Sequence, residues 1–573
     1  MQAKQGRFRV ATLTFTLGAL LYILFLVLLR YDLKPSLVGF WIPIILMVAV
    51  ITYQIFKYPG SEKLILFEIF LFTLLAHWET VIPCRAGAFG DDFPQYFFTT
   101  TAVMEHGFPP PAGALARPPY SELLSNWMIP GLAMYPVMIM NGGVTSMVTG
   151  VDLISISRWL PSIWSSIAIL AIYILSKSLY GNTRAALLVA FGFSTYITYL
   201  ETHSQYVREG IAFTMMLFAI YTFYTAYRKN RRSLVSLALL FAIATVLAHY
   251  YVTIMWIAML ILLATCFKLI DYLAGRGRFL PSVTPNRTPV WGFVFLAVII
   301  AFAHWLYMEV EVIPRIAYQL AGTIIRHGSP TFPSPAEQAT LKGEIVSWGT
   351  WLTGISFIIV ILWQIIKGLR GKSSSLSEDL ALAAWVGTVF MLFSVLLANV
   401  MLNPGRVPVF AYPFMLMVVT HAAVTMNKQR MKQIVIAVVV FFVVFNLFRI
   451  PFVSLNPLAP AELARITSTA EGRFVSVRYY FQQDPQGIKG ADFYQDAGDA
   501  KFVRRFIIGD ETVMAEPYEP EGWEEIVRKP GSGEYLSRFP GIKPYTQSYI
   551  VVDPNLYQQH DRVYNNGRVQ VLK

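Results

Sequence analysis

The sequence predicts an α-helical polytopic membrane protein with a small soluble domain at its C-terminal end. Hydrophobic residues make up 55% of the 573 residues and charged residues only 14%. The apolar residues gather in repeated runs of about 20, each long enough to cross roughly 30 Å of hydrocarbon. Basic residues concentrate in the short loops between these runs. The formal net charge of +12 therefore reports orientation in a membrane and not nucleic-acid binding.

The first apolar run, at about residues 10–29, predicts a retained span because it lacks the small-residue cleavage site of a signal peptide. Lys4, Arg7 and Arg9 precede it and place the N-terminus in the cytoplasm. We expect about thirteen spans in all, the others at about 37–56, 64–82, 156–176, 184–200, 210–227, 234–249, 252–267, 290–308, 347–366, 380–402, 407–426 and 433–450.

The loops that this count places in the cytoplasm carry the basic residues, which supports the alternation of inner and outer loops. These residues are Lys177, Arg184, Arg228, Lys229, Arg231, Arg232, Lys268, Arg276, Arg278, Arg287, Lys367, Arg370, Lys372, Lys428, Arg430 and Lys432. The segment 127–150 is apolar but is broken by Pro130, Pro136, Gly142 and Gly143. We interpret it as one or two interfacial helices, since another span would reverse every later loop.

Three substantial segments then lie outside: the loops 83–155 and 309–346, and everything after residue 450. The sequence thus predicts a transmembrane domain, residues 1–450, and a small α/β extracytoplasmic domain, residues 451–573. The end of the chain, residues 561–571, predicts a β-hairpin around Asn566-Gly567, because Asn-Gly suits a tight turn. Cys84 and Cys266 fall on opposite sides of the membrane, so no disulfide is expected.

Two adjacent carboxylates, Asp91 and Asp92, follow the third predicted span after a short connection. Acids near hydrocarbon are costly, so they are usually solvated, cap a helix or take part in chemistry. Pro94 fits the first turn of an interfacial helix, and either Asp could cap that helix. One of the two could cap it while the other reacts.

A tight outer loop between two spans contains Glu201, His203 and Arg208. The planar guanidinium of Arg208 matches the oxygens of a lipid phosphate. The alternative is an intramolecular ion pair with Glu209 or Glu201, since buried charges must be paired.

Two further outer positions are candidates for substrate binding. His249 and Tyr250 form the tip between two spans and could belong to an interfacial aromatic belt or hydrogen-bond a substrate or its phosphate. Arg406 is the only charge of its short outer loop. Such a loop departs from the positive-inside trend, which favours a specific anionic partner over an ordinary interfacial arginine.

With this layout the chain resembles the GT-C superfamily of membrane glycosyltransferases, which take sugars from polyprenyl-phosphate donors. It is similar in pattern to protein mannosyltransferases, aminoarabinose transferases and the catalytic subunits of oligosaccharyltransferases. The shared features are the acidic pair Asp91-Asp92 after an early span, a long first outer loop, a many-helix body and an extracytoplasmic C-terminal domain. Tyr206 to Gly210, His249-Tyr250 and Arg406 also look like positions of prokaryotic relatives.

The resemblance implies an inverting transfer of a sugar to an acceptor at the outer face, with Asp91 or Asp92 as the general base. Arg208 and Arg406 would stabilise the departing lipid phosphate, and Glu201, His203, His249 and Tyr250 would bind substrate. Some members use a divalent metal such as Mg²⁺ or Mn²⁺, for which Asp91, Asp92, Glu201 and His203 could supply ligands. The implied partners are the donor lipid, a glycan, lipid or protein acceptor, and the membrane; a prokaryotic plasma membrane fits best, with the endoplasmic reticulum as the alternative.

Two departures from the family narrow this expectation. The acidic pair follows the third span and not the first, and no Trp-Trp-Asp signature is present in the tail. Transfer of a single sugar or a short glycan is therefore favoured over transfer of a whole oligosaccharide. The alternatives are a transporter or flippase of an anionic lipid-linked substrate, and a glycan polymerase or ligase; the sequence lacks an inverted repeat, and its polar residues gather on one face, which disfavours a transporter.

Overall fold

The computed structural model describes the helical core and four short strands of the chain, namely residues 2–30, 37–82, 100, 103–104, 135–204, 206–229, 231–275, 290–308, 341–369, 407–426, 428–449, 536–540, 547–551, 562–565 and 570–572. The chain divides into two compact units. Unit 1 comprises Met1–Pro83, Trp159–Ser204 and Arg208–Pro460, and unit 2 comprises Cys84–Arg158, Gln205–Val207 and Ala461–Lys573.

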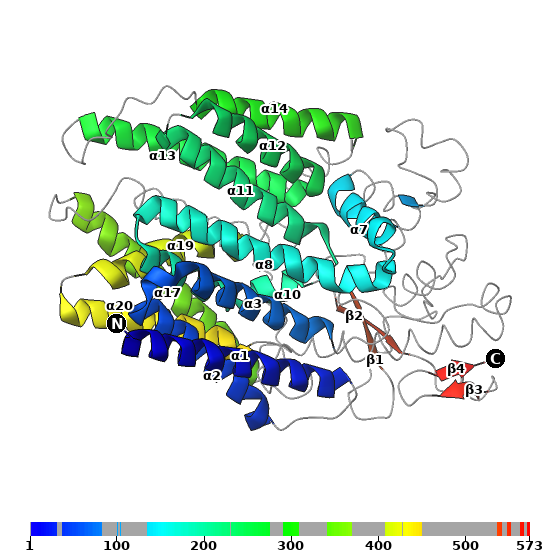
Figure 1. Ribbon diagram of the computed structural model, residues 1–573. Coiled ribbons are helices and arrows are strands. Elements are labelled where there is room, and N and C mark those ends of the chain that lie inside the picture. The colour runs from blue at the N-terminus through cyan, green and yellow to red at the C-terminus, as the bar shows by residue number, and fades with distance from the viewer. Residues whose placement is uncertain are drawn as a thin grey trace. The chain divides into compact units, whose positions relative to one another are not determined.

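Unit 1 consists of helices, many of which run side by side in Figure 1. They are α1 (Gln2–Arg30), α2 (Leu37–Lys57), the short 3₁₀ helix η1 (Pro59–Ser61), α3 (Glu62–Val81), most of α8 (Leu153–Tyr180), α9 (Thr183–Ser194), α10 (Ile197–His203), α11 (Arg208–Lys229), α12 (Arg232–Ala248), α13 (Tyr250–Gly275), α14 (Val290–Met308), α17 (Leu341–Leu369), α19 (Val407–Thr425) and α20 (Gln429–Arg449).

Among the described helices, six are long and apolar enough to cross a membrane, and a seventh span results if α2 and α3 count as one bent pair. The helix axis bends by 113° at the break between them. A helix is described at every predicted span except 380–402, which lies outside the described residues. The polytopic helical architecture agrees with the prediction, while the count of thirteen spans stays a prediction.

The predicted span 184–200 is not one continuous helix, because α9 ends at Ser194 and α10 begins at Ile197. The hydroxyls of Ser194 and Thr195 bond back to the carbonyls of Phe191 and Gly192, an alternative to continuing the helix. The Asn446 side chain of α20 then accepts the N–H of Ile197 at 3.3 Å. The break is therefore stabilised at both sides.

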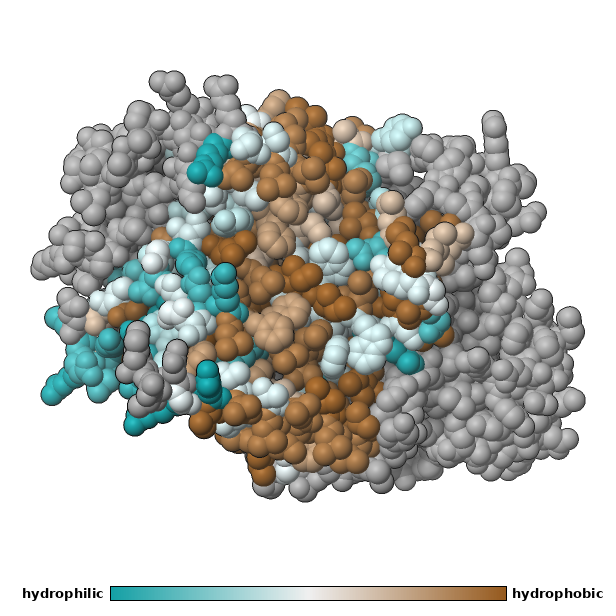
Figure 2. Space-filling model, viewed as in Figure 1, coloured by the Kyte–Doolittle hydropathy of each residue, from teal (hydrophilic) through white to brown (hydrophobic). Residues whose placement is uncertain are grey.

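The surface of the helical region carries a belt of apolar side chains, which runs from top to bottom through the middle of the face in Figure 2 with hydrophilic residues gathered to its left. Exposed members include Leu13, Leu17 and Leu20 on α1 and Phe295 and Leu306 on α14. Such a belt on a soluble protein would be an aggregation hazard. On a membrane protein it is the surface that meets lipid.

The core of unit 1 is aromatic where α9, α10, α17, α19 and α20 meet. Tyr196 lies 4.5 Å from Tyr412, ring centroid to centroid, and Phe442 contacts Tyr412 at 5.5 Å and Phe357 at 5.3 Å. Close helix approach is made possible by Gly349 of α17, where an added Cβ would lie 2.1 Å from the ring of Phe445. Small residues at such crossings are typical of membrane helices.

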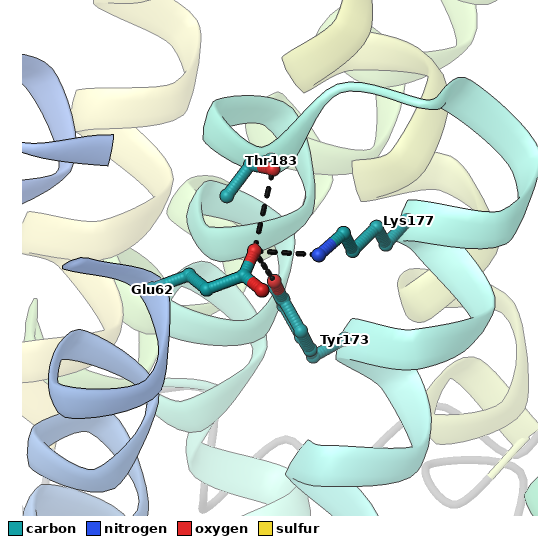
Figure 3. A network of polar contacts seen from close by, with 4 residues as sticks. All are labelled: Glu62, Tyr173, Lys177 and Thr183. Carbon is teal, nitrogen blue, oxygen red and sulfur yellow. Dashed lines mark hydrogen bonds and ion pairs between the residues drawn. The ribbon is translucent and has the colours of Figure 1, made fainter. Parts of the chain in front are cut away.

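Glu62, the first residue of α3, makes polar contacts with two neighbouring helices (Figure 3). Glu62 Oε2 accepts hydrogen bonds from Lys177 Nζ at 2.5 Å and Tyr173 Oη at 2.9 Å, both on α8, and lies 3.4 Å from Thr183 Oγ1 of α9. The Glu62 and Lys177 side chains are about one-third exposed. This cluster joins three helices through one carboxylate oxygen.

Two further carboxyl groups of α3 are buried against α1 and α2. Glu68 Oε1 accepts from Gln54 Nε2 at 3.2 Å, and Gln54 Nε2 also approaches Thr12 Oγ1 at 3.4 Å. Glu79 accepts a short hydrogen bond from the Tyr22 hydroxyl. Both glutamates are 1% exposed. Polar contacts therefore tie α3 to α1 and α2 within the apolar part of the bundle.

Unit 2 contains α7 (Pro136–Thr149), which covers part of the predicted interfacial segment 127–150. The helix ends at Gly150, whose φ of 68° is the left-handed conformation that glycine adopts readily. Gly142 packs against Tyr206, and a Cβ there would lie 2.0 Å from the Tyr206 hydroxyl oxygen. Because α7 has 14 residues, it is too short to span a bilayer, and its interfacial location stays a prediction.

Asp152 follows α7 and caps the start of α8. Its Oδ1 accepts the Ser155 N–H at 2.9 Å. Hydrogen bonds from the Ser155 side chain and backbone hold the pKa of Asp152 below its ordinary value.

The described strands of unit 2 form two antiparallel pairs. β1 (Leu536–Pro540) pairs with β2 (Gln547–Val551), and β3 (Arg562–Asn565) pairs with β4 (Gln570–Leu572) with an irregularity between Arg562 and Tyr564. The second pair confirms the strand pairing predicted at the end of the chain, while its Asn-Gly turn lies outside the described residues. The α/β character of residues 451–573 and the domain boundary at 450 stay predictions.

Candidate functional site

The candidate site of unit 1 is built where α10 ends and α11 begins. Arg208 and Glu209 are the first two residues of α11, and the residues are 8% and 7% exposed. An acid in the first turn is favourable because the helix dipole is positive at that end. One turn of chain earlier, His203 ends α10 and is 3% exposed. Charged groups buried this deeply at the ends of membrane helices are costly and are most often functional.

The start of α11 packs closely on its neighbours. A Cβ on Gly210 would lie 3.4 Å from Ser165 Oγ and 3.7 Å from His203 Cβ, which is ordinary van der Waals contact. The Thr214 hydroxyl donates to the Trp164 carbonyl at 3.1 Å. The helix that carries Arg208 is therefore held against α8 and α10.

His249 connects α12 to α13 in an extended conformation, with φ of −164° and ψ of 127°. Its Nδ1 faces two backbone donors, the N–H groups of Tyr251 at 3.1 Å and Val252 at 3.4 Å. Nδ1 must accept these bonds, so in the neutral ring the proton sits on Nε2. The ring caps α13 and keeps a defined tautomer.

The Nε2 atom of His249 lies 3.8 Å from Glu209 Oε1. A second proton on the ring would have to sit on Nδ1, where it would point at the two backbone N–H donors. Their repulsion disfavours the imidazolium. The contact is therefore best described as a neutral Nε2–H directed at a carboxylate. Tyr250 stacks on His249 with ring centroids 5.1 Å apart.

Ring contacts join His203 to His249 across four helices. His203 meets Phe213 at 5.1 Å, Phe213 meets Phe410 at 5.6 Å, and Phe410 meets Tyr251 at 6.0 Å, all edge to face. Tyr251 in turn contacts the ring of His249 at 6.4 Å. Phe410 is in the first turns of α19, the helix that follows Arg406 in the sequence.

The structure describes four of the predicted site residues, His203, Arg208, His249 and Tyr250. The backbone of Glu201 is part of α10, but its side chain lies outside the described residues, as do Asp91, Asp92 and Arg406 entirely. The roles of all these residues stay predictions.

Sequence reasoning named Glu209 only as a possible ion-pair partner of Arg208, and it assigned no role to His77 or Ser204. His77 Nδ1 lies 2.8 Å from Ser204 Oγ, and both residues are buried. His77, Glu68 and Glu79 were detectable as ionisable residues inside the predicted span 64–82. The partnership of Glu209 with His249 had no sequence signal, because the two residues belong to different predicted spans.

The described part of the chain contains no group of three His, Cys, Asp or Glu side chains placed to bind a divalent metal. Of the predicted ligands Asp91, Asp92, Glu201 and His203, only His203 has a described side chain. Its ring is packed between Tyr199 at 4.8 Å and Phe213. Metal binding therefore stays a prediction.

The helices and their apolar belt have the properties of a polytopic membrane protein with buried charges at its helix ends. No family model and no curated protein matches the chain. Among solved structures, the chain is similar to the oligosaccharyltransferase of Archaeoglobus fulgidus crystallised with zinc and sulfate, at 13% identity and a TM-score of 0.43. The match covers 79% of this chain and 58% of that one. A likeness of this size establishes no family.

Proposed function

We propose that the chain is a membrane glycosyltransferase of the GT-C type, which transfers a sugar from a polyprenyl-phosphate donor to an acceptor on the outer face of the membrane. The observation that carries the proposal is the burial of Arg208 and Glu209 at the start of α11, where Glu209 Oε1 lies 3.8 Å from His249 Nε2. The acidic pair Asp91-Asp92, on the loop that follows α3 in the sequence, supplies a candidate base. Nucleotide sugars are confined to the cytoplasm, so an outward-facing transferase needs a donor carried on lipid.

The proposed reaction is an in-line displacement. Asp91 or Asp92 accepts the proton of an acceptor hydroxyl, and the hydroxyl oxygen attacks the anomeric carbon. The bond from that carbon to the phosphate oxygen breaks with its electron pair, so polyprenyl phosphate leaves and the configuration inverts. Arg208 and Arg406 stabilise the charge that develops on the leaving phosphate.

In this scheme His249 acts as a neutral donor. The backbone N–H groups at Nδ1 fix its tautomer, so Nε2 carries the proton that the ring would donate to a phosphate or sugar oxygen. Glu209 is 3.8 Å from the same atom and orients the ring. Tyr250 stacks on that ring and is a further substrate-binding candidate, together with Glu201 and His203.

The test is transfer of radiolabelled sugar from a panel of polyprenyl-phosphate sugars by purified protein in nanodiscs. Asp91→Asn and Asp92→Asn should separate the two carboxylates: one variant loses turnover and retains donor binding. Arg208→Lys should weaken donor binding because an ammonium cannot form the bidentate contact. The same assay with and without a chelator decides the dependence on Mg²⁺ or Mn²⁺.

Absence of transfer by the wild-type protein over the donor and acceptor panel contradicts the proposal. If the protein then moves the labelled lipid between the leaflets of vesicles, a flippase replaces it. Loss of donor binding in both Asp variants would instead assign the acidic pair to substrate binding.

We also propose a multi-pass plasma-membrane location with the N-terminus in the cytoplasm and residues 451–573 outside. The two native cysteines test this orientation. A membrane-impermeant maleimide added to intact cells should label Cys84 and spare Cys266, and Cys84→Ser should abolish the labelling. Labelling of Cys266 with protection of Cys84 would reverse the orientation.

A further inference from the structure

A buried hydrogen bond connects α3 to the end of α10. His77 Nδ1 and Ser204 Oγ are 2.8 Å apart, and the two side chains are 0% and 1% exposed. The Ser204 hydroxyl donates its proton to the carbonyl of Leu200 in the preceding turn. The hydroxyl oxygen must therefore accept from His77, which places the ring proton on Nδ1.

The same end of α10 is fixed from a second direction. The Tyr199 hydroxyl donates to the backbone carbonyl of Ser165 on α8, and the Ser165 hydroxyl donates to the His203 carbonyl at 2.9 Å. The Tyr199 ring lies edge to face with the His77 ring at 5.4 Å. Consequently α3, α8 and α10 are joined by directed hydrogen bonds and a ring contact around one residue, Tyr199.

The position of this junction in the sequence gives it significance. Ser204 precedes Arg208 by four residues, and His77 lies one turn before the end of α3, the helix that leads into the Asp91-Asp92 loop. The bond between His77 and Ser204 therefore ties the last turn of α3 to the end of α10. A functional group is held more precisely when the segment that carries it starts from a fixed helix end.

We propose that His77 is a positioning residue for transfer, which holds the α10–α11 turn in register with the end of α3 through Ser204. The proposal rests on the proposed function, because it assigns the acidic loop and Arg208 to one reaction. It differs from a purely structural role in that its loss lowers turnover in protein that remains folded.

The experiment uses the full-length chain in nanodiscs with four single variants and one double variant. His77→Leu and Ser204→Ala each remove the bond, while His77→Asn keeps an N–H donor near the position of Nδ1. The double variant combines His77→Leu with Ser204→Ala. His421→Leu is the matched control, since that histidine stacks on Tyr180, fifteen residues and roughly 22 Å along α8 from Ser165.

Two readouts are measured, amide hydrogen exchange of residues 204–210 and the steady-state constants per folded molecule. His77→Leu and Ser204→Ala should each speed exchange of this segment and lower kcat on the order of 10- to 100-fold, as small misplacements of reacting groups do. KM for the donor should change little. The double variant should be no slower than the single ones, His77→Asn should retain most of the rate, and His421→Leu should match the wild type.

Unchanged exchange of residues 204–210 in His77→Leu overturns the proposal, whatever the activity. Faster exchange with unchanged kcat overturns it as well, since the bond would then be structural only. If the wild-type protein transfers no sugar, the proposed function fails while the exchange measurement still decides whether His77 holds the turn.

Discussion

Two carboxyl groups of the same helix, Glu62 and Glu79, have opposite surroundings. Glu62 begins α3, is 32% exposed and has the Lys177 ammonium at 2.5 Å. Glu79 lies near the other end, is 1% exposed, and accepts a hydrogen bond from the neutral hydroxyl of Tyr22. Near water a carboxylate can be kept ionised by a cation, whereas in an apolar interior an acid without a cation partner is more stable neutral.

Glu68 belongs with Glu79 in this comparison. Its partner is the Gln54 amide, and its Oε2 atom has no hydrogen-bond partner among the described residues. The same is true of Glu79 Oε1. A proton on either of these oxygens would neutralise the carboxylate, which costs less free energy inside a bilayer than a buried charge.

The largest effect is expected when Glu79 loses Tyr22. Tyr22→Phe removes the hydroxyl and leaves a buried carboxyl group without its donor, which should lower the free energy of unfolding by about 1–2 kcal/mol. Reversible unfolding in mixed detergent measures the change. Phe15→Leu on the same helix is a control for packing alone, and a Tyr22→Phe variant as stable as the wild type would show that the bond contributes nothing.

A smaller effect is expected at the exposed cap of α8. Asp152→Ala should cost about 0.5–1 kcal/mol because Ser155 loses its acceptor. The pKa of Asp152 is lowered in the folded state, so its stabilisation is present above the ordinary Asp pKa and is lost as the pH falls through the lowered value. Unfolding should therefore differ between Asp152→Ala and the wild type at neutral pH and converge in acid. A constant difference would assign the effect to helix propensity.

The ion pair at Glu62 should contribute less, since it is partly exposed. A double-mutant cycle with Glu62→Gln and Lys177→Met should give a coupling energy of about 0.2–1 kcal/mol, which decreases at high salt. Thr183→Val serves as the comparison, because its contact with Glu62 is longer and uncharged. A coupling that does not depend on salt would mean that the pair is shielded from solvent.

The smallest effect is expected for Glu79→Gln. A neutral amide resembles a neutral acid, so the change should stay within about 0.5 kcal/mol. Infrared difference spectra of wild type and Glu79→Gln at neutral pH should show the carbonyl band of a protonated acid, which Glu62→Gln should not remove. Absence of that band would mean that Glu79 is ionised and has a cation partner.

The helices were predictable from the sequence because apolar runs of span length determine them directly. The break between Ser194 and Ile197 was not, because it depends on Asn446, which belongs to another helix. Likewise, Glu68 and Glu79 are visible as acids within the run 64–82, but the sequence does not show that Gln54 and Tyr22 are their partners. Apolarity along the chain predicts that a helix exists, but it does not say which neighbour receives a polar side chain.

Less of the candidate site could be predicted. Helix-end polar residues such as Arg208 and His249 were identifiable from their place in the loops, and in the structure they lie at helix ends and are buried. The contact between Glu209 and His249 and the bond from His77 to Ser204 depend on packing between segments distant in sequence. The roles assigned to Asp91, Asp92 and Arg406 stay predictions.

The polar side chains of α3 also have a consequence for how the protein is made. An acid in a membrane helix disfavours insertion by the translocon, by up to about 2.5–3.5 kcal/mol at the centre of the helix. Glu68 and Glu79 both find their partners on helices that are synthesised earlier, Gln54 on α2 and Tyr22 on α1. The hydrogen-bond partners of Glu68 and Glu79 are therefore already synthesised when α3 emerges from the ribosome. We expect the first three helices to enter the membrane as one unit.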